Sequence, residues 1–105
     1  MYRYVKHNKI LLAPSKREDS TKAILEFFKK IQTQDSKIKG FIVMDSLEDY
    51  SESIILTFWE TKEDMDNFYQ PDNRLLSDLV DTLKPYFKTL PERKSYQVSD
   101  IKVYS

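Results

Sequence analysis

Apolar and polar positions along this chain alternate in some stretches and recur every three or four residues in others, and these patterns predict its strands and helices. β-Branched, aromatic and aliphatic residues from Tyr2 to Leu12 predict a first strand, closed by the breaker cluster Ala13-Pro14-Ser15. A helix capped by Ser20 or Asp19 is predicted next, because apolar residues then recur every three or four positions. These apolar positions are Ala23, Ile24, Phe27, Phe28 and Ile31.

The middle of the chain reads as a β-hairpin. Gly40 opens "GFIVMD", a short second strand, and the polar stretch Ser46–Ser53 connects it to a third strand, "IILTFW". Both faces of this third strand are apolar, with Ile54, Leu56 and Phe58 on one face and Ile55, Thr57 and Trp59 on the other. A sheet with one face in water should alternate apolar with polar residues, so we expect a second copy of the chain to cover the other face.

The last third of the chain predicts an interrupted helix and a final strand. Thr61-x-x-Asp64 is a capping pattern for a helix that carries Met65, Phe68 and Tyr69, and Pro71 interrupts that helix. Asp72 or Asn73 restarts it, and Pro85 kinks or ends it. "KSYQVSDIKVYS" predicts a fourth strand, broken by a bulge near Ser99-Asp100. The order β-α-β-β-α-β predicts a ferredoxin-like α+β fold with a four-stranded antiparallel sheet, and a single domain over residues 1–105.

Composition and charge narrow the classes of function. With 40% hydrophobic and 32% charged residues, the 105-residue chain has an ordinary globular composition and is long enough for one core. Its 17 basic and 17 acidic residues create no global field toward nucleic acid or an anionic membrane. The absence of cysteine excludes disulfides, thiolate metal sites and a cysteine nucleophile. The longest apolar run is far below the ~20 residues of a membrane helix. We therefore expect a soluble, cytoplasmic protein without a nucleic-acid or membrane partner.

Most polar motifs have a structural explanation. His7 is the only histidine and has no neighbouring nucleophile or carboxylate motif, which favours a structural or exposed role. The acids of Asp45–Glu52 lack calcium-loop spacing, and those of Glu60–Asp66 suit a helix start. Lys39–Ser46 opens like an RNA-recognition signature but has Val43 where a base-stacking aromatic belongs. A single glycine excludes a Gly-rich phosphate loop. We therefore expect no metal and no bound cofactor.

An aromatic set at the boundary of sheet and helices is the remaining candidate site, with Asn8 as its polar member. Core packing explains such a set most simply, but Trp and Tyr usually need a polar partner for their N–H and O–H groups, which also suits a ligand pocket. Whether the third strand turns Trp59 or Phe58 toward the helices decides which of them can line that pocket. The set comprises Phe41, Phe58, Trp59, Phe68, Tyr69 and Tyr96.

The block "ILTFWETKEDMDNFYQ", residues 55–70, resembles the antibiotic biosynthesis monooxygenase family of dimeric α/β-barrel proteins. The resemblance continues over nearly the whole chain, through "HNKILL", "GFIVMDSLED" and the C-terminal strand. It implies a homodimer in which two four-stranded sheets close into one barrel. Family members include cofactor-independent monooxygenases of quinols and polycyclic phenols, and haem-degrading enzymes.

The resemblance also implies site residues. In the haem-degrading branch an Asn, a Trp and a His form the site; Asn8 matches the first, whereas Phe68 and Asp78 lie near the other two, so haem degradation is disfavoured. For the quinol and phenol oxygenases it implies that Asn8, Trp59 and Tyr69 line the site and donate to an anionic intermediate that reacts with O₂. We place Phe41, Phe58, Phe68 and Tyr96 in the ligand pocket. The alternative is a non-catalytic dimeric ligand-binding or interaction module.

Overall fold

A computed structural model describes residues 3–32, 34 and 37–104 of the chain. Its sheet has the order β2-β3-β1-β4 with antiparallel neighbours throughout, which confirms the predicted ferredoxin-like α+β fold. The strands are β1 (Tyr4–Leu11), β2 (Ile38–Asp45), β3 (Glu52–Trp59) and β4 (Glu92–Gln97). The helices are α1 (Arg17–Gln32), α2 (Lys62–Phe68) and α3 (Arg74–Leu83), with 3₁₀ turns η1 (Pro14–Lys16) and η2 (Lys84–Tyr86). None of the helices in the described ranges is long and apolar enough to span a membrane.

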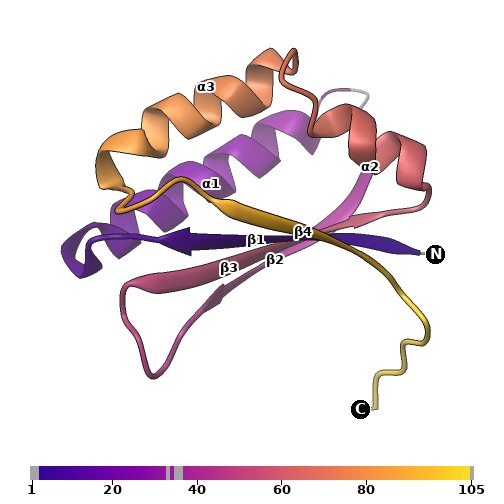
Figure 1. Cartoon of the computed structure of the whole chain (residues 1–105), viewed down its shortest axis with the longest axis horizontal. Helices are drawn as coiled ribbons and strands as arrows, with labels where there is room; N and C mark the ends of the chain where they lie inside the picture. Colours follow the sequence, from indigo (N-terminus) through magenta and orange to yellow (C-terminus); the bar gives the residue numbers. More distant parts are fainter. Residues whose placement is uncertain (1–2, 33, 35–36, 105) are drawn as a thin grey trace.

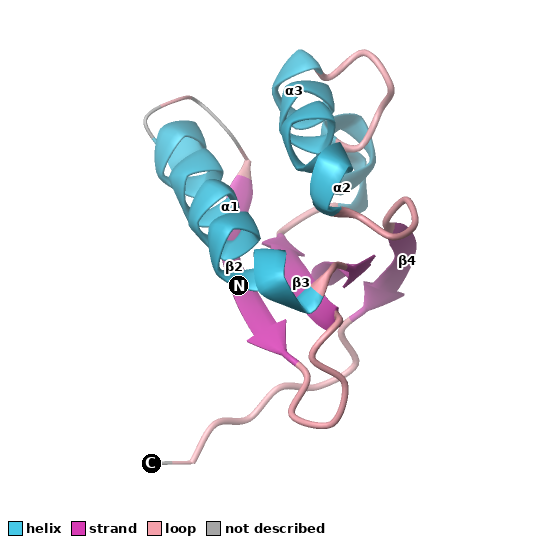
Figure 2. Cartoon of the chain, turned by 90° about the vertical axis from the view of Figure 1, so that its left-hand side faces the viewer, coloured by secondary structure: helices cyan, strands magenta, loops and turns pink. Residues whose placement is uncertain are grey.

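The helices all cover the same face of the sheet (Figures 1 and 2). β3 turns Ile55, Thr57 and Trp59 toward them, and all three side chains are buried. Leu56 and Phe58 point the other way and are half-buried. Trp59 therefore belongs to the helix-covered side. The core on this side comprises Ile10, Leu12, Ile24, Phe28, Ile31, Ile55 and Leu83.

The predicted helix starts are right for α2 and α3 and wrong for α1. Thr61 Oγ1 accepts a hydrogen bond from the Asp64 N–H (3.1 Å), and Asn73 Oδ1 caps α3. α1 begins earlier than the predicted Ser20 or Asp19, because Pro14 opens the turn η1 that runs directly into it. A proline has its φ already set for the first turn of a helix and lacks only an N–H that would be unsatisfied there, so it starts this helix as well as closing β1.

β4 is shorter than predicted and lies nearer the N-terminus. It covers Glu92–Gln97, and beyond Val98, whose N–H donates to the Arg3 carbonyl (2.7 Å), residues 99–104 form no regular strand and no bulge. The physical reason is that β4 pairs only with β1, and the pairing ends where β1 begins. Ile101 and Val103 are accordingly exposed, and this segment leads away from the sheet (Figure 1). Tyr2 and Ser105, the outer limits of the predicted strands, lie outside the described residues.

The face of the sheet opposite the helices is rich in apolar side chains. Ile42, Met44 and Tyr96 are between 42% and 50% exposed there. Strand register places them beside half-buried neighbours of the same face, so all four strands contribute apolar side chains to it, alongside the charged Lys9, Glu92 and Lys94. The half-buried neighbours are Val5, His7, Ile54, Leu56 and Phe58. We call this surface the open sheet face.

Arg17, the first residue of α1, ties the helix to the β2–β3 hairpin. One terminal nitrogen of its guanidinium donates to the Ser46 carbonyl (3.2 Å) and the Glu52 carbonyl (3.0 Å), and its Nε lies 3.5 Å from a carboxylate oxygen of Asp45. The Ser53 hydroxyl also donates to that carboxylate (2.7 Å). Asp45, one of the hairpin acids considered as a metal ligand, thus has a structural role. Within the described ranges, no group of three or more His, Asp or Glu residues could hold a metal ion.

Candidate functional site

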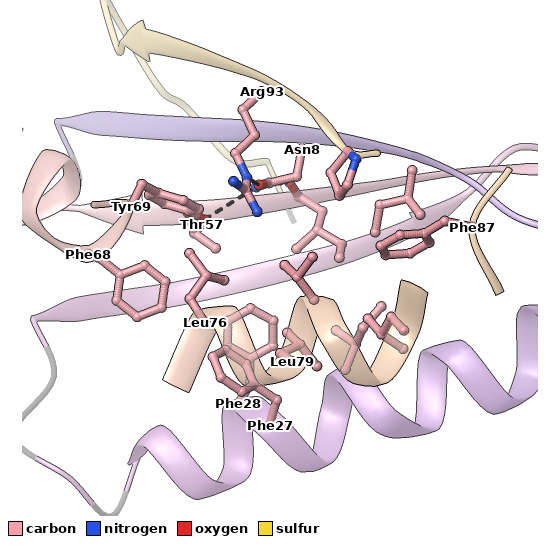
Figure 3. Close-up of a pocket in the computed structure, with 16 residues that line it drawn as sticks. Asn8, Phe27, Phe28, Thr57, Phe68, Tyr69, Leu76, Leu79, Phe87 and Arg93 are labelled. Carbon is pink, nitrogen blue, oxygen red and sulfur yellow. Dashed lines mark hydrogen bonds between the residues drawn. The ribbon is translucent and has the colours of Figure 1, made fainter. Parts of the chain in front are cut away.

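A small cavity lies between the helix-covered face of the sheet, α1 and α3 (Figure 3). Its volume is about 40 Å³, and most of its wall is apolar. Four polar side chains meet at one end: Asn8 of β1, Thr57 of β3, Tyr69 just after α2, and Arg93 of β4. The aromatic and aliphatic wall includes Phe27, Phe28, Phe68, Leu76, Leu79 and Phe87.

The four polar residues of the cavity belong to one hydrogen-bonded chain that continues to Trp59. The indole N–H of Trp59 donates to Thr57 Oγ1 (2.9 Å), and Thr57 Oγ1 lies 2.9 Å from the Tyr69 hydroxyl oxygen. Asn8 Nδ2 donates to the Ile55 carbonyl (3.0 Å) and, over 3.4 Å, to the Tyr69 hydroxyl. Arg93 Nε donates to Asn8 Oδ1 (3.0 Å). Because the two ends of the Asn8 amide have an acceptor and a donor as partners, its orientation is set.

In this hydrogen-bonded network, the hydroxyl groups of Thr57 and Tyr69 have two protons between them but an acceptor for only one. The Trp59 N–H and the Asn8 amide are obligatory donors, and they supply a hydrogen bond to Thr57 and Tyr69 respectively. Only one of the two hydroxyl protons can lie between Thr57 and Tyr69. The other has no acceptor in the part of the chain that the structure describes, and both hydroxyl-bearing residues line the cavity. The polar end therefore offers a donor to a ligand oxygen.

Tyr69 is held as a neutral phenol between two cations. Burial raises the pKa of its hydroxyl, against the opposing effects of the hydrogen bonds with Thr57 and Asn8 and of the nearby Arg93. The Lys6 ammonium lies 5.0 Å and the Arg93 guanidinium 5.2 Å from the centre of the Tyr69 ring. Both distances are within cation–π range.

An open groove of about 310 Å³ adjoins the cavity. The two share the side chains of Tyr69, Leu76, Val80 and Arg93 as walls, so these residues lie between the closed cavity and the surface. The other groove residues are mostly polar or charged and come from the α2–α3 connection and α3. They are Gln70, Pro71, Asn73, Ser77 and Asp81. The groove is thus a route to the cavity along α3.

The structure brings three of the sequence-predicted site residues to the cavity wall: Asn8, Phe68 and Tyr69. Trp59 lies behind them, fully buried, with its ring packed on Phe68 (5.1 Å between centroids), and its N–H is directed at Thr57. Trp59 can therefore act on a ligand only through the hydroxyl of Thr57. Phe41 stacks on Phe28 (4.1 Å) and belongs to the core beside the cavity.

Phe58 and Tyr96 do not share a pocket with the other predicted residues. Strand register places both opposite Val5, on the open sheet face. The expectation that they line the same pocket as Asn8 is corrected accordingly, since side chains of one strand alternate between the two faces. His7 lies on this face too, with its ring 6.1 Å from that of Tyr96 in an edge-on contact.

Sequence reasoning missed Thr57 and Arg93 as members of the site. Thr57 had a visible signal, because it is the only polar residue in the predicted strand "IILTFW". Arg93 had none: the predicted fourth strand began at Lys94, and only the pairing of Arg93 with Asn8 across β4 and β1 shows where it lies.

Comparisons with known proteins agree with this architecture. No protein-family model matches the sequence, and no curated protein matches it significantly. A monooxygenase from the gene ActVA-Orf6 of Streptomyces coelicolor, solved in complex with the ligand nanaomycin D, superposes with a TM-score of 0.81 at 11% identity, over 99% of this chain and 94% of that one.

Two further structures give the same result. A candidate antibiotic biosynthesis monooxygenase from Caulobacter crescentus has a TM-score of 0.77 at 10% identity, over 94% of this chain and 92% of its own. A conserved protein from Methanosarcina mazei has a TM-score of 0.74 at 14% identity, over 91% and 92%. The resemblance inferred from residues 55–70 is thus confirmed at the level of the fold, and this chain has the fold of the antibiotic biosynthesis monooxygenases.

Proposed function

We propose that this protein binds a small, largely apolar aromatic molecule in the cavity beside Asn8 and Tyr69, as a cytoplasmic homodimer. The leading enzymatic hypothesis is cofactor-independent oxygenation of a quinol or phenol. The observation that carries the proposal is the unmatched hydroxyl proton of Thr57 or Tyr69 at the polar end of an otherwise apolar cavity. The fold shared with a ligand-bound monooxygenase supports it.

The site's contribution to such a reaction is electrostatic. The unmatched hydroxyl of Thr57 or Tyr69 can donate a hydrogen bond to a phenolic oxygen of the substrate, and this bond stabilises the phenolate anion. The Arg93 guanidinium adds positive charge nearby. None of the described residues that line the cavity is a carboxylate or a histidine, so the substrate proton leaves toward solvent along the groove. The anion then reacts with O₂ while the apolar wall excludes water. Oxidation of a ring CH₂ of the keto tautomer to C=O, with water as the second product, needs no external reductant.

A ring enters only if α3 moves. The cavity of about 40 Å³ has room for a few water molecules, whereas a cavity that binds benzene measures roughly 150 Å³. α3 is the wall best suited to move, because only Leu83 of its residues is fully buried while Leu76, Leu79 and Val80 are half-buried. Displacement of α3 would join the cavity to the groove, and the combined space would accept a bicyclic ring.

The homodimer is proposed to form through the open sheet face. Its half-exposed Ile42, Met44 and Tyr96 and their apolar neighbours are side chains that a second sheet of the same shape would bury. Light scattering at micromolar concentration tests this point. The expected mass is twice that of the chain, and a stable monomer would contradict the proposed dimer.

The small cavity also favours a second candidate, a non-catalytic dimeric ligand-binding or interaction module. In that case the network from Trp59 to Arg93 only rigidifies the fold, with water as the acceptor of the remaining proton. The two candidates differ in chemistry, since only the enzyme consumes oxygen.

Oxygen uptake with a panel of quinols and naphthols separates them. The enzyme hypothesis predicts uptake that falls at least tenfold in Asn8→Ala and stays unchanged in Asn67→Ala, an exposed asparagine of α2 as the matched control. Circular dichroism verifies that both variants are folded. Ring binding without uptake by any panel member would favour the module. Titration with haem should give no shift of the Soret band, because no histidine lies in the cavity wall.

A further inference from the structure

Arg93 lies at the junction of cavity and groove. It lies on β4 directly opposite Asn8, and its Nε donates to Asn8 Oδ1 (3.0 Å). Its guanidinium stands over the Tyr69 ring, with its carbon 5.2 Å from the ring centre. Strand pairing, the hydrogen bond and the ring contact orient the guanidinium of this exposed residue, with its terminal nitrogens toward the cavity (Figure 3).

This guanidinium has no anionic partner in the described part of the chain. Its terminal nitrogens make no hydrogen bond or ion pair there, although Asp81 lines the same groove. Lys6, on the same Tyr69 ring, donates to the Ser95 hydroxyl (2.7 Å) and is likewise without an ion pair in these ranges. Burial lowers the pKa of Lys6, partly offset by Asp66, and Arg93 lowers it further. Within the described residues, these two neighbouring cations therefore form no direct ion pair at the mouth of an apolar cavity.

We propose that the ligand carries a carboxylate on its aromatic ring and that the terminal nitrogens of Arg93 bind this carboxylate. The inference rests on the proposed function, because it names the class of molecule that occupies the same cavity. A planar guanidinium has two parallel N–H groups that match the two oxygens of a carboxylate. With the carboxylate at Arg93, the ring extends inward past Leu76 and Val80, and its far end reaches the apolar wall.

Two probes of the same shape test whether the negative charge of the ligand contributes to binding. 2-Naphthoate and 2-naphthamide have the same ring and differ in the anionic group, and isothermal titration calorimetry measures the affinity of each for the full-length protein. We expect the acid to bind at least tenfold more tightly than the amide, in line with the roughly 10- to 100-fold value of a hydrogen bond to a charged group. In Arg93→Gln the preference should fall below twofold.

The matched control is Arg74→Gln, which removes the same charge from an exposed arginine of α3 that lines neither the cavity nor the groove. It should retain the full preference. Equal binding of acid and amide by the wild type, or a preference that survives in Arg93→Gln, would overturn the carboxylate assignment and leave aromatic binding intact. Binding of neither probe would overturn the proposed function and this inference with it.

Discussion

Replacement of Thr57 by valine should be among the most destabilising single changes in the site. Thr57 is 1% exposed, and its hydroxyl is the partner of both the Trp59 N–H and the Tyr69 hydroxyl, each at 2.9 Å. Valine keeps the shape of the side chain but leaves the buried indole N–H without an acceptor. An unsatisfied buried donor costs about 1–3 kcal/mol, and the lost bond to Tyr69 adds about 1 kcal/mol. We expect a loss of about 2–4 kcal/mol of unfolding free energy.

Tyr69→Phe provides the comparison that isolates the buried donor. This substitution removes the hydrogen bond between Tyr69 and Thr57, while Thr57 still accepts from the Trp59 N–H. It should therefore lower the free energy of unfolding by only about 0.5–1.5 kcal/mol. Because the two side chains share a bond, the double variant should cost less than the sum of the single variants.

Urea unfolding measures all three variants at one fixed protein concentration, because dimerisation would make the midpoint depend on concentration. Trp59 is the only tryptophan, so its fluorescence reports the environment of the network directly. At a typical slope, the predicted loss in Thr57→Val lowers the urea midpoint by roughly 1–3 M. A Thr57→Val variant that loses less than Tyr69→Phe, or strict additivity of the two changes, would show that the Thr57 hydroxyl is not the acceptor on which the buried indole N–H depends.

Three further predictions concern the contacts of Arg17 with the β2–β3 hairpin, the Tyr69 phenol and the open sheet face. Arg17→Met should lose about 2–4 kcal/mol of unfolding free energy in urea melts, because the Ser46 and Glu52 carbonyls lose a charged donor. The exposed Lys22→Met should change little, and equal effects of the two substitutions would show that the Arg17 contacts do not stabilise the fold. Burial raises the folded-state pKa of Tyr69 above the unfolded value of about 10, so stability should fall as pH rises above about 10. Tyr69→Phe should reduce this loss of stability, which is measured as the change of the urea midpoint between pH 9 and pH 11. A midpoint that changes equally with pH in the wild type and in Tyr69→Phe would contradict the prediction. Leu56→Glu should yield monomers by light scattering, and a persistent dimer would exclude the open sheet face as the interface.

Local sequence signals were sufficient for most of the fold. The alternation in "IILTFW" and the helical spacing of the apolar residues before Ile31 each depend on short-range periodicity, which predicted β3 and α1 as elements. Capping by Thr61 and Asn73 was visible in the same way. The end of β4 could not be predicted from local signals, because the length of this edge strand depends on how much of its partner, β1, remains for pairing. Ile101 and Val103 alternate like a strand, and yet no strand in the described part of the chain pairs with them.

The site was predictable only in part for a related reason. Asn8 and Tyr69 could be inferred as polar members of an aromatic set, but the partners that give them chemical meaning come from distant parts of the chain. Arg93 lies 85 positions from Asn8, and no local pattern links them. Phe58 was misplaced because both faces of β3 are apolar, so its pattern alone could not distinguish the cavity side from the open sheet face.

Whether a phenolic ring binds in the cavity can be measured by an NMR titration. Two-dimensional ¹H–¹⁵N spectra recorded with increasing 2-naphthol should show saturable shifts of the Asn8 side-chain amide and of the backbone amides of Thr57, Tyr69 and Leu76. Absence of shifts at saturating ligand, or shifts confined to residues of the open sheet face such as Ile42, would contradict binding in the cavity.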